Sequence, residues 1–154
     1  MNAHQTRPDV HDEPTIWFQP IDLEQLNRRG RNSMVEHLKI VFTESGHDYV
    51  KATMPVDATT MQPFGRLHGG ASMALAETVG STAANLCIDL DRFLCVGMEI
   101  NANHIRAARG GSVTGVARPL HIGRTSHVWS ITIYDDDEKL VCVSRLTMAV
   151  IHRK

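Results

Sequence analysis

The sequence has no excess of charge of either sign, few cysteines and no apolar run long enough to cross a membrane. Its 154 residues carry a formal net charge of -1, which predicts neither a duplex nucleic-acid surface nor a polybasic membrane contact. The three cysteines, Cys87, Cys95 and Cys142, form no C-x-x-C pair, and the polar N-terminal residues do not resemble a secretory signal. We therefore expect a cytoplasmic protein with reduced thiols that binds neither nucleic acid nor a membrane.

Two common kinds of catalytic site are also missing from the sequence. The nine histidines form neither H-E-x-x-H nor a Cys/His zinc spacing, so we expect no metal site. The segment Gly70–Ala74 matches the G-x-S-x-G nucleophile elbow only in part, because alanine replaces its last glycine. The chain also lacks the length and element order of an α/β-hydrolase.

Length and composition are typical of one globular domain. Hydrophobic residues make up 42% of the chain and charged residues 21%, and the chain is long enough to bury a core without disulfides or metals. Residues 1–15 contain little apolar material, so we expect a flexible N-terminal tail there. The predicted domain covers residues 16–154.

The periodicity of the apolar residues predicts both helices and strands. Between Leu23 and Leu38 apolar residues recur at helical spacing, with Asp22 as an N-cap, which indicates one or two short helices. Two β-rich runs, 38–45 and 49–55, flank a short turn and predict a hairpin. Turn signals separate four further expected strands, at 93–106, 112–121, 126–135 and 140–151.

A single long helix is expected between the two groups of strands. It follows a loop over residues 56–66, begins at Gly69 or Gly70 and ends near Cys87 or Ile88. Its many alanine, glycine and serine residues favour close packing against a sheet. This order of elements predicts an α+β domain in which a curved antiparallel sheet wraps around one long central helix.

Glu77 stands in the middle of this small and apolar helix. A buried carboxylate is unfavourable unless it is paired, hydrogen-bonded or used in chemistry. At the start of the helix, His68-Gly69-Gly70 offers unpaired N–H groups that can stabilise a developing oxyanion, and glycine allows close approach of a substrate. Glu77 is therefore the main candidate for a nucleophile or general base, and a structural carboxylate bonded across a dimer is the alternative.

Helix geometry separates Glu77 from the start of its own helix. Gly69 and Glu77 are eight residues apart, which corresponds to about 12 Å at ~1.5 Å per residue. A carbonyl held by the Gly69 N–H cannot then lie within about 3 Å of Glu77 from the same helix. The sequence predicts an obligate dimer with antiparallel helices, in which each site combines Gly69 of one subunit with Glu77 of the other.

Several motifs accompany this helix. They are Gln62-Pro-Phe-Gly-x-Leu-His-Gly-Gly-Ala-Ser with Glu77 nine residues after the His, Met54-Pro-Val-Asp57, Gly97-Met-Glu-Ile-Asn-Ala-Asn-His104, and Pro119-Leu-His-Ile-Gly-Arg124 followed by Val128-Trp129. Together with the element order they resemble the hotdog-fold acyl-coenzyme A thioesterases. More narrowly, they resemble the branch of 1,4-dihydroxy-2-naphthoyl-CoA and aryl-CoA thioesterases, including the phenylacetate-pathway type, and the resemblance extends over residues 16–151.

The resemblance implies a fold, an activity and a site. The fold is the hotdog fold, and the activity is hydrolysis of an acyl-CoA thioester to the free acid and CoA. No cofactor is implied, because CoA is part of the substrate. The implied assembly is a homodimer at minimum, with a homotetramer built as a dimer of dimers expected, and the active sites lie at the dimer interface.

Individual roles also follow from the resemblance. Gln62 and His68 would orient the thioester and the catalytic carboxylate, and the Gly69 N–H would polarise the carbonyl. Ser81, one turn beyond Glu77 on the same helix face, would position the water or the acyl group. Met73 and Thr78 would line the acyl pocket. The coenzyme A nucleotide would be bound by His104, Arg106, Gly123 and Arg124, with Arg109 and Arg145 as weaker candidates.

Simpler interpretations stay open for most of these residues. His68 could simply cap the helix, and Gln62 could form hydrogen bonds within its own loop. Ser81 could be a small residue for helix packing, and each arginine could be an exposed surface charge. A hotdog dehydratase, or a non-catalytic acyl-CoA binding or sensing module in which Glu77 is silent, are the alternative functions. With 5% aromatic residues, the sequence indicates no aryl-stacking pocket, so the acyl group stays open, as does direct or water-mediated attack by Glu77.

Overall fold

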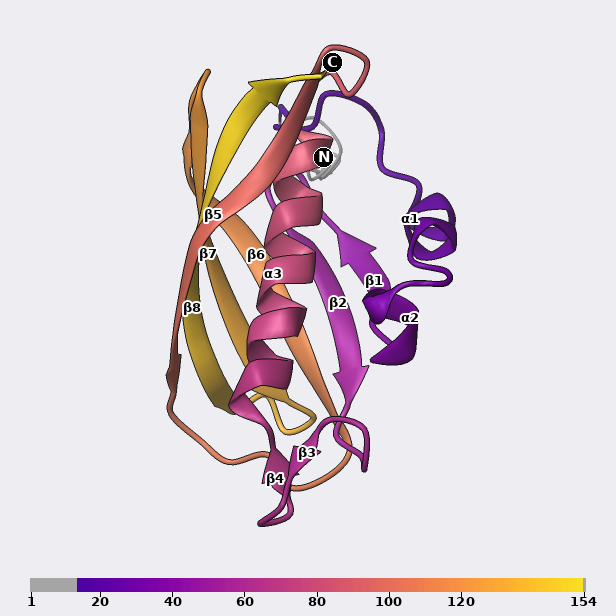
Figure 1. The fold of residues 1–154 in the computed structure, drawn as a ribbon, viewed down its shortest axis with the longest axis vertical. Coiled ribbons are helices and arrows are strands. Elements are labelled where there is room, and N and C mark those ends of the chain that lie inside the picture. Colours follow the sequence, from indigo (N-terminus) through magenta and orange to yellow (C-terminus); the bar gives the residue numbers. More distant parts are fainter. Residues whose placement is uncertain (1–13, 154) are drawn as a thin grey trace, which may run out of the picture.

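The protein folds as a curved sheet around one long helix (Figure 1). The computed structural model describes residues 14–153. The helix α3 spans Gly69–Leu86, and the sheet has six antiparallel strands in the order β1-β2-β6-β7-β8-β5. Their bounds are β1 Val41–Ser45, β2 Val50–Pro55, β5 Phe93–His104, β6 Ser112–Ile122, β7 Ser126–Asp135 and β8 Leu140–His152. The predicted α+β hotdog architecture is confirmed.

Two short helices precede the sheet, as predicted. The first, α1 (Leu23–Arg29), begins after Asp22, whose side chain accepts the N–H of Gln25. The second, α2 (Met34–His37), follows in the same segment. None of the helices within residues 14–153 is long and apolar enough to span a membrane.

The expected N-terminal tail falls mostly on residues 1–13, which lie outside the described residues. From Thr15 onward the chain contacts the turn between β1 and β2. The Thr15 Oγ1 and the Ile16 N–H both donate to the carbonyl of His47, at 3.3 and 3.0 Å.

Strand β1 begins at Val41, three residues later than the predicted Leu38. Residues 38–40 instead close the end of α2, where the Leu38 N–H donates to Met34 and the Ile40 N–H to Val35. Lys39 takes a positive φ of 54°, the left-handed conformation that commonly ends a helix. Local helix termination therefore overrides the β-rich composition of this run.

The segment 56–66, predicted as a loop, contains a small hairpin. Its strands are β3 (Met61–Gln62) and β4 (Arg66–Leu67), and Gly65 takes a φ of 70° in the turn between them. The hairpin lies at the N-terminal end of α3 (Figure 1). It carries Gln62 and leads directly into His68.

Helix α3 lies close to the sheet because its inner face is made of small residues. Ala76, Ala83 and Ala84 are fully buried, beside the larger Leu75 and Val79. A Cβ atom on Gly80 would lie 2.7 Å from Leu146 Cδ2 and 3.1 Å from Ile131 Cδ1, so the approach at this point requires glycine. The predicted close packing of this helix on the sheet is confirmed.

Strand β5 is an edge strand, since among the strands of residues 14–153 it pairs with β8 alone. Its ladder contains a β-bulge: Gly97 pairs with Met148 and Glu99 with Thr147, so Met98 is an extra residue. Because side chains alternate along a strand, an extra residue exchanges the two faces. As a result both Gly97, before the bulge, and His104, after it, face α3.

Asn85 of α3 fastens the helix to this edge strand. Its Oδ1 accepts the N–H of Cys95 at 2.9 Å, and its Nδ2 donates to the carbonyl of Cys95 at 3.1 Å and to that of Ser81 at 2.9 Å. The side chain thus satisfies both backbone groups of Cys95, as a neighbouring strand would.

Replacing Asn85 by alanine leaves the backbone groups of the buried Cys95 without these partners. We expect Asn85→Ala to lower the free energy of unfolding by about 1–3 kcal/mol. Urea denaturation at one fixed protein concentration measures the change. Gln25→Ala, which removes a single exposed bond from Arg29, is the control and should cost less than about 0.5 kcal/mol. Equal losses for the two variants would contradict a special role for Asn85.

Candidate active site

The N-terminus of α3 has one free backbone donor. His68 is the N-cap, with φ of -70° and ψ of 133°, and its Nδ1 accepts the N–H of Gly70 at 2.8 Å. The capping interpretation of His68 is therefore confirmed, which leaves its other predicted role open. The N–H of Gly69 donates to no acceptor among the described residues. This N–H group lies at the N-terminus of an 18-residue helix, which is the positive end of the helix dipole.

Four of the predicted residues meet beside this donor. Gln62, Gly69, His104 and Arg106 line a hollow of about 300 Å³. A Cβ atom on Gly69 would lie 2.8 Å from Nε2 of His104, so the imidazole is packed against the glycine. Strand β5 thus places His104 next to Gly69, the first residue of α3.

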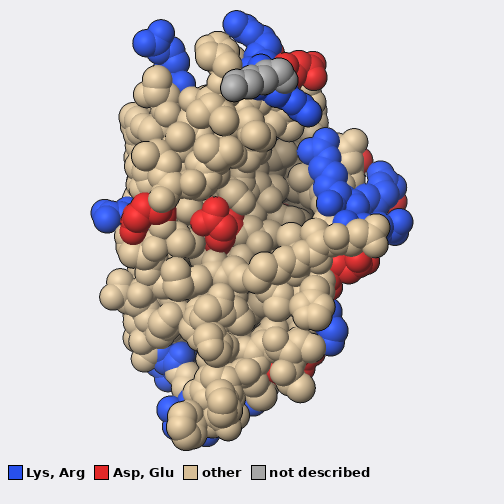
Figure 2. All heavy atoms as spheres, viewed as in Figure 1, with Lys and Arg blue, Asp and Glu red and all other residues tan. Residues whose placement is uncertain are grey.

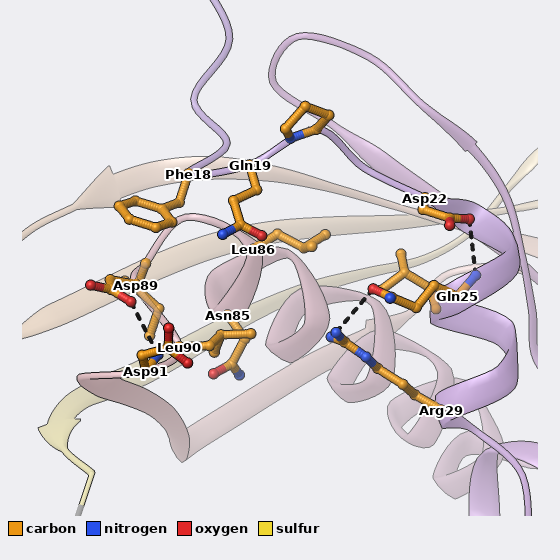
Figure 3. Close-up of a pocket in the computed structure, with 13 residues that line it drawn as sticks. Phe18, Gln19, Asp22, Gln25, Arg29, Asn85, Leu86, Asp89, Leu90 and Asp91 are labelled. Carbon is orange, nitrogen blue, oxygen red and sulfur yellow. Dashed lines mark hydrogen bonds between the residues drawn. The ribbon is translucent and has the colours of Figure 1, made fainter.

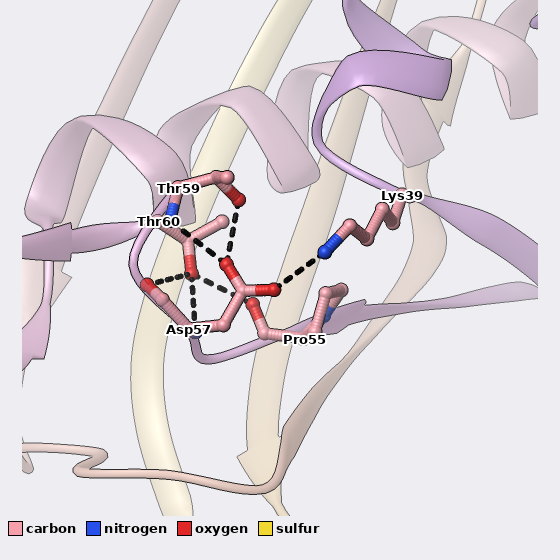
Figure 4. A network of polar contacts seen from close by, with 5 residues as sticks. All are labelled: Lys39, Pro55, Asp57, Thr59 and Thr60. Atoms are coloured by element: carbon pink, nitrogen blue, oxygen red, sulfur yellow. Dashed lines mark hydrogen bonds and ion pairs between the residues drawn. The ribbon is translucent and has the colours of Figure 1, made fainter.

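A polar network holds the start of the segment that carries Gln62 (Figure 4). The Asp57 carboxylate accepts from Lys39 Nζ at 2.7 Å, and from the N–H and Oγ1 of Thr59 at 2.8 and 2.6 Å. The bond from Lys39, followed by those from Thr59, holds the pKa of Asp57 well below its usual range. The ion pair between Asp57 and Lys39 therefore ties this turn to the segment that follows α2.

Thr60 connects this turn to the helix entrance. Its buried Oγ1 donates to the carbonyl of Pro55 at 2.8 Å and accepts the N–H of Asp57 at 3.0 Å. Its own carbonyl accepts the N–H of His68 at 2.8 Å. Gln62, two residues further on, is held in turn by the N–H of Phe64, which its Oε1 accepts. The predicted loop bonding of Gln62 is thus present.

Glu77 lies away from this hollow, against the edge strand. Its carboxylate is half-buried and makes no hydrogen bond or ion pair with any other residue in the described range. Burial raises the pKa of Glu77. A Cβ atom on Gly97 would lie 2.6 Å from its Oε1, so the carboxylate rests on the β5 backbone.

The other predicted residues of α3 flank Glu77. Thr78 Oγ1 donates to the carbonyl of Ala74 at 2.7 Å, and Ser81 Oγ donates to that of Thr78 at 3.4 Å. Both hydroxyls therefore bond to their own helix, and their oxygens keep acceptor capacity. Met73 is half-buried midway between Gly69 and Glu77.

The four residues predicted for the nucleotide do not gather in one subunit. Gly123 and Arg124 lie in the β6–β7 turn, beside the pair Ile122 and His127. That pair is in register with Met148 and Gly97. His104 lies in a different row across the sheet, in register with Cys142, Ile133 and Gly115. This row is closer to the other end of the same strands. The predicted residues thus divide into one set near Gly69 and another at the end of the sheet where Glu77 meets β5.

The two weaker arginine candidates belong to neither set. Arg109 is exposed in the β5–β6 connection, and Arg145 is exposed on the sheet face opposite α3, between the buried Ser144 and Leu146.

A second hollow, of about 200 Å³, lies at the C-terminal end of α3 (Figure 3). The segment before α1, α1 itself and the loop after α3 enclose it, and polar side chains including Asn85, Asp22 and Asp89 line it. None of the residues predicted for the site lines this hollow. Within residues 14–153, no three His, Cys, Asp or Glu side chains come together as a metal site would require.

The fold is of the hotdog type, and comparison with known proteins shows the activity that accompanies it. Residues 64–142 match the thioesterase superfamily. The chain is 52% identical over 136 residues to the 1,4-dihydroxy-2-naphthoyl-CoA hydrolase of Escherichia coli, covering 88% of this chain and 99% of that protein. It is also 52% identical to a proofreading thioesterase of Cronobacter sakazakii, covering 88% and 98% of the two chains.

A solved structure is equally similar. A mutant thioesterase from Pseudomonas aeruginosa superposes with a TM-score of 0.89 at 51% identity, covering 90% of this chain and all of that one. The chain belongs to the thioesterase superfamily and is a thioester hydrolase. The resemblance inferred from the motifs is confirmed.

The buried carboxylate should make stability depend on pH. The folded state holds the pKa of Glu77 above its ordinary 4.5, so the unfolded chain binds fewer protons between the two values and wild-type stability falls as the pH rises through that window. We expect Glu77→Gln, which cannot ionise, to unfold at higher urea concentration than wild type at pH 7.5. The difference should shrink to near zero at pH 4. A less stable Glu77→Gln at pH 7.5 would show instead that the carboxylate has a favourable partner.

Proposed function

We propose that the protein hydrolyses an acyl-CoA thioester to the free acid and CoA, with Glu77 as nucleophile or general base. The observation that carries this proposal is the pairing of two unused groups on one helix of a thioesterase. Glu77 is a half-buried carboxylate without a partner in the described chain, and Gly69 is a free N–H at the helix start. One can attack or activate water and the other can receive the oxyanion.

The two groups act together only across a dimer. About 12 Å of helix separates them at ~1.5 Å per residue, which is too far for one thioester carbon to contact both. Along α3 and β5, Gly69 lies against His104 and Glu77 against Gly97. A two-fold axis between these contacts, near Met73 of α3 and Ile100 of β5, brings Glu77 of one subunit opposite Gly69 of the other.

The surface over α3 and β5 suits such an interface. Figure 2 shows that this face carries little charge apart from acidic groups at mid-height, while lysine and arginine gather at its margins. Strand β5 has 12 residues and pairs with no described strand on its outer edge, where Asn85 occupies only the backbone groups of Cys95, and Met98 at its bulge is 66% exposed. Edge-to-edge pairing of two β5 strands would cover both features. A dimer is the proposed minimum, and a dimer of dimers follows from the family resemblance.

Two routes are chemically consistent with this geometry. In the first, Glu77 attacks the thioester carbon, forms a mixed anhydride and expels the CoA thiolate, which takes a proton, and water then hydrolyses the anhydride. In the second, Glu77 removes a proton from a water molecule that attacks the same carbon, and the tetrahedral intermediate then expels the CoA thiolate, which takes that proton. In both, the Gly69 N–H and the helix dipole stabilise the tetrahedral oxyanion. The reaction consumes only water, so no cofactor is needed.

The same dimer unites the residues proposed for coenzyme A. His104 and Arg106 lie at the Gly69 end, and Gly123 and Arg124 lie near Glu77 of the same chain. In the proposed dimer, the partner's Gly123 and Arg124 approach the end that holds His104 and Arg106. Guanidinium groups from both sides then face the nucleotide phosphates. The three free cysteines are consistent with the cytoplasmic location expected from the sequence.

The proposed acyl group is aryl or medium-chain, and the name of the Escherichia coli relative supports the aryl class. Wild type and Glu77→Gln should be compared on benzoyl-, 1,4-dihydroxy-2-naphthoyl-, hexanoyl- and acetyl-CoA by release of free thiol. We expect Glu77→Gln to lose at least about 10²-fold in kcat while still binding CoA. Unchanged hydrolysis would refute the role of Glu77. Tight binding without hydrolysis by wild type would favour a binding or sensing module.

Mixing defective subunits tests the shared site. Gly69→Pro removes the N–H, while the proline fits the first helical position and the extended His68 before it, so we expect kcat to fall about 10²- to 10³-fold. Gly69→Ala keeps the N–H and is the control for the added Cβ. Equal amounts of Gly69→Pro and Glu77→Gln, refolded together, should regain about a quarter of wild-type activity, because each mixed dimer has one intact site. If each subunit held a complete site, the mixture would stay inactive.

A further inference from the structure

Gly97 is a glycine whose backbone conformation does not explain it. It lies within strand β5, and its φ is outside the left-handed region that disfavours other residues. Its place in a strand interior is unfavourable for folding, since glycine loses more chain entropy than other residues. The reason for glycine must therefore lie in what surrounds it.

The space that a side chain would fill at this position holds the Glu77 carboxylate. A Cβ atom on Gly97 would lie 2.6 Å from Oε1, 3.5 Å from Cδ and 3.7 Å from Oε2 of Glu77. Contacts under 3.0 Å are essentially never made by real Cβ atoms, so the carboxylate would have to move. No hydrogen bond or ion pair from the described residues otherwise fixes this carboxylate.

The bulge next to Gly97 directs this contact. Met98 is the extra residue, and it brings Gly97 onto the face of β5 that looks at α3 while His104 keeps that same face seven residues later. In an unbroken strand, residues an odd number apart lie on opposite faces. The bulge thus lets one edge strand serve both Glu77 and Gly69.

We propose that Gly97 is a positioning residue, which by lacking a side chain seats the Glu77 carboxylate on the β5 backbone at the place from which it acts on the thioester. This inference rests on the proposed function. The added Cβ in Gly97→Ala displaces the carboxylate without touching the groups that bind CoA. The effect therefore falls on turnover and not on substrate binding.

The test is the kinetics of Gly97→Ala with an acyl-CoA that wild type hydrolyses. We expect kcat to fall about 10- to 100-fold and KM to change less than about 3-fold, because small misplacements of a reacting group are costly in rate. Gly115→Ala is the matched control. It is also a strand glycine facing α3, but its Cβ would meet Leu75 Cγ at 3.2 Å, so it should affect stability and change kcat less than about 2-fold.

A double variant separates this contact from a general folding defect. Gly97→Ala should be less favourable for stability in the wild-type chain, where the added Cβ displaces the Glu77 carboxylate, than in a Glu77→Ala background, where the clashing oxygen is gone. If Gly97→Ala alone does not fold, the double variant should fold. An equal change in stability in both backgrounds would overturn the proposal.

Two kinetic outcomes are also decisive. Unchanged kcat in Gly97→Ala, with Glu77→Gln inactive, would overturn the role of Gly97 alone. If Glu77→Gln kept full hydrolysis, the proposed function would fail, and with it the role of Gly97.

Discussion

The structure depends on the close approach of α3 to the concave face of the sheet. Small inner residues allow this approach, and at Gly80 a single methyl group would already meet Leu146. The helix is thus held within the curve of the sheet, and its N-terminus opens beside the β3–β4 hairpin. Everything that the site needs from the backbone follows from that placement. Gly69 presents a free N–H, Glu77 reaches the edge strand, and neither can move along the sheet.

The helix and the edge strand together set the distances within the site. Besides the Asn85 bonds to Cys95, two contacts join them, Gly69 with His104 and Glu77 with Gly97, and these two are separated by the span of helix between Gly69 and Glu77. Residues that sequence motifs associate with one reaction are consequently distributed over two ends of one subunit. A second subunit is the simplest way to bring the two ends together. The proposed chemistry and the proposed assembly both follow from the same helix length.

Much of this arrangement was predictable from the sequence, because it follows from local periodicity. The strand over residues 126–135 and the helix that begins at Gly69 match their predicted bounds closely. The start of β1 was wrong because capping of α2 uses Leu38 and Ile40. The β3–β4 hairpin, the Asn85 bridge and the seat of Glu77 on Gly97 depend on contacts distant in sequence. Composition and spacing carry no signal for them, although Gly97 did stand inside a recognised motif.

The bulge at Met98 makes the length of β5 as important as its composition. Loss or gain of one codon between Gly97 and His104 would leave nearly every residue of the strand in place, yet turn one of these two positions away from the helix. Neighbouring residues can compensate for a substitution along this strand. They cannot compensate for a change from an odd to an even number of residues between the two positions and the bulge. The spacing of seven residues between Gly97 and His104 should therefore change less during evolution than the identities of the residues that fill it.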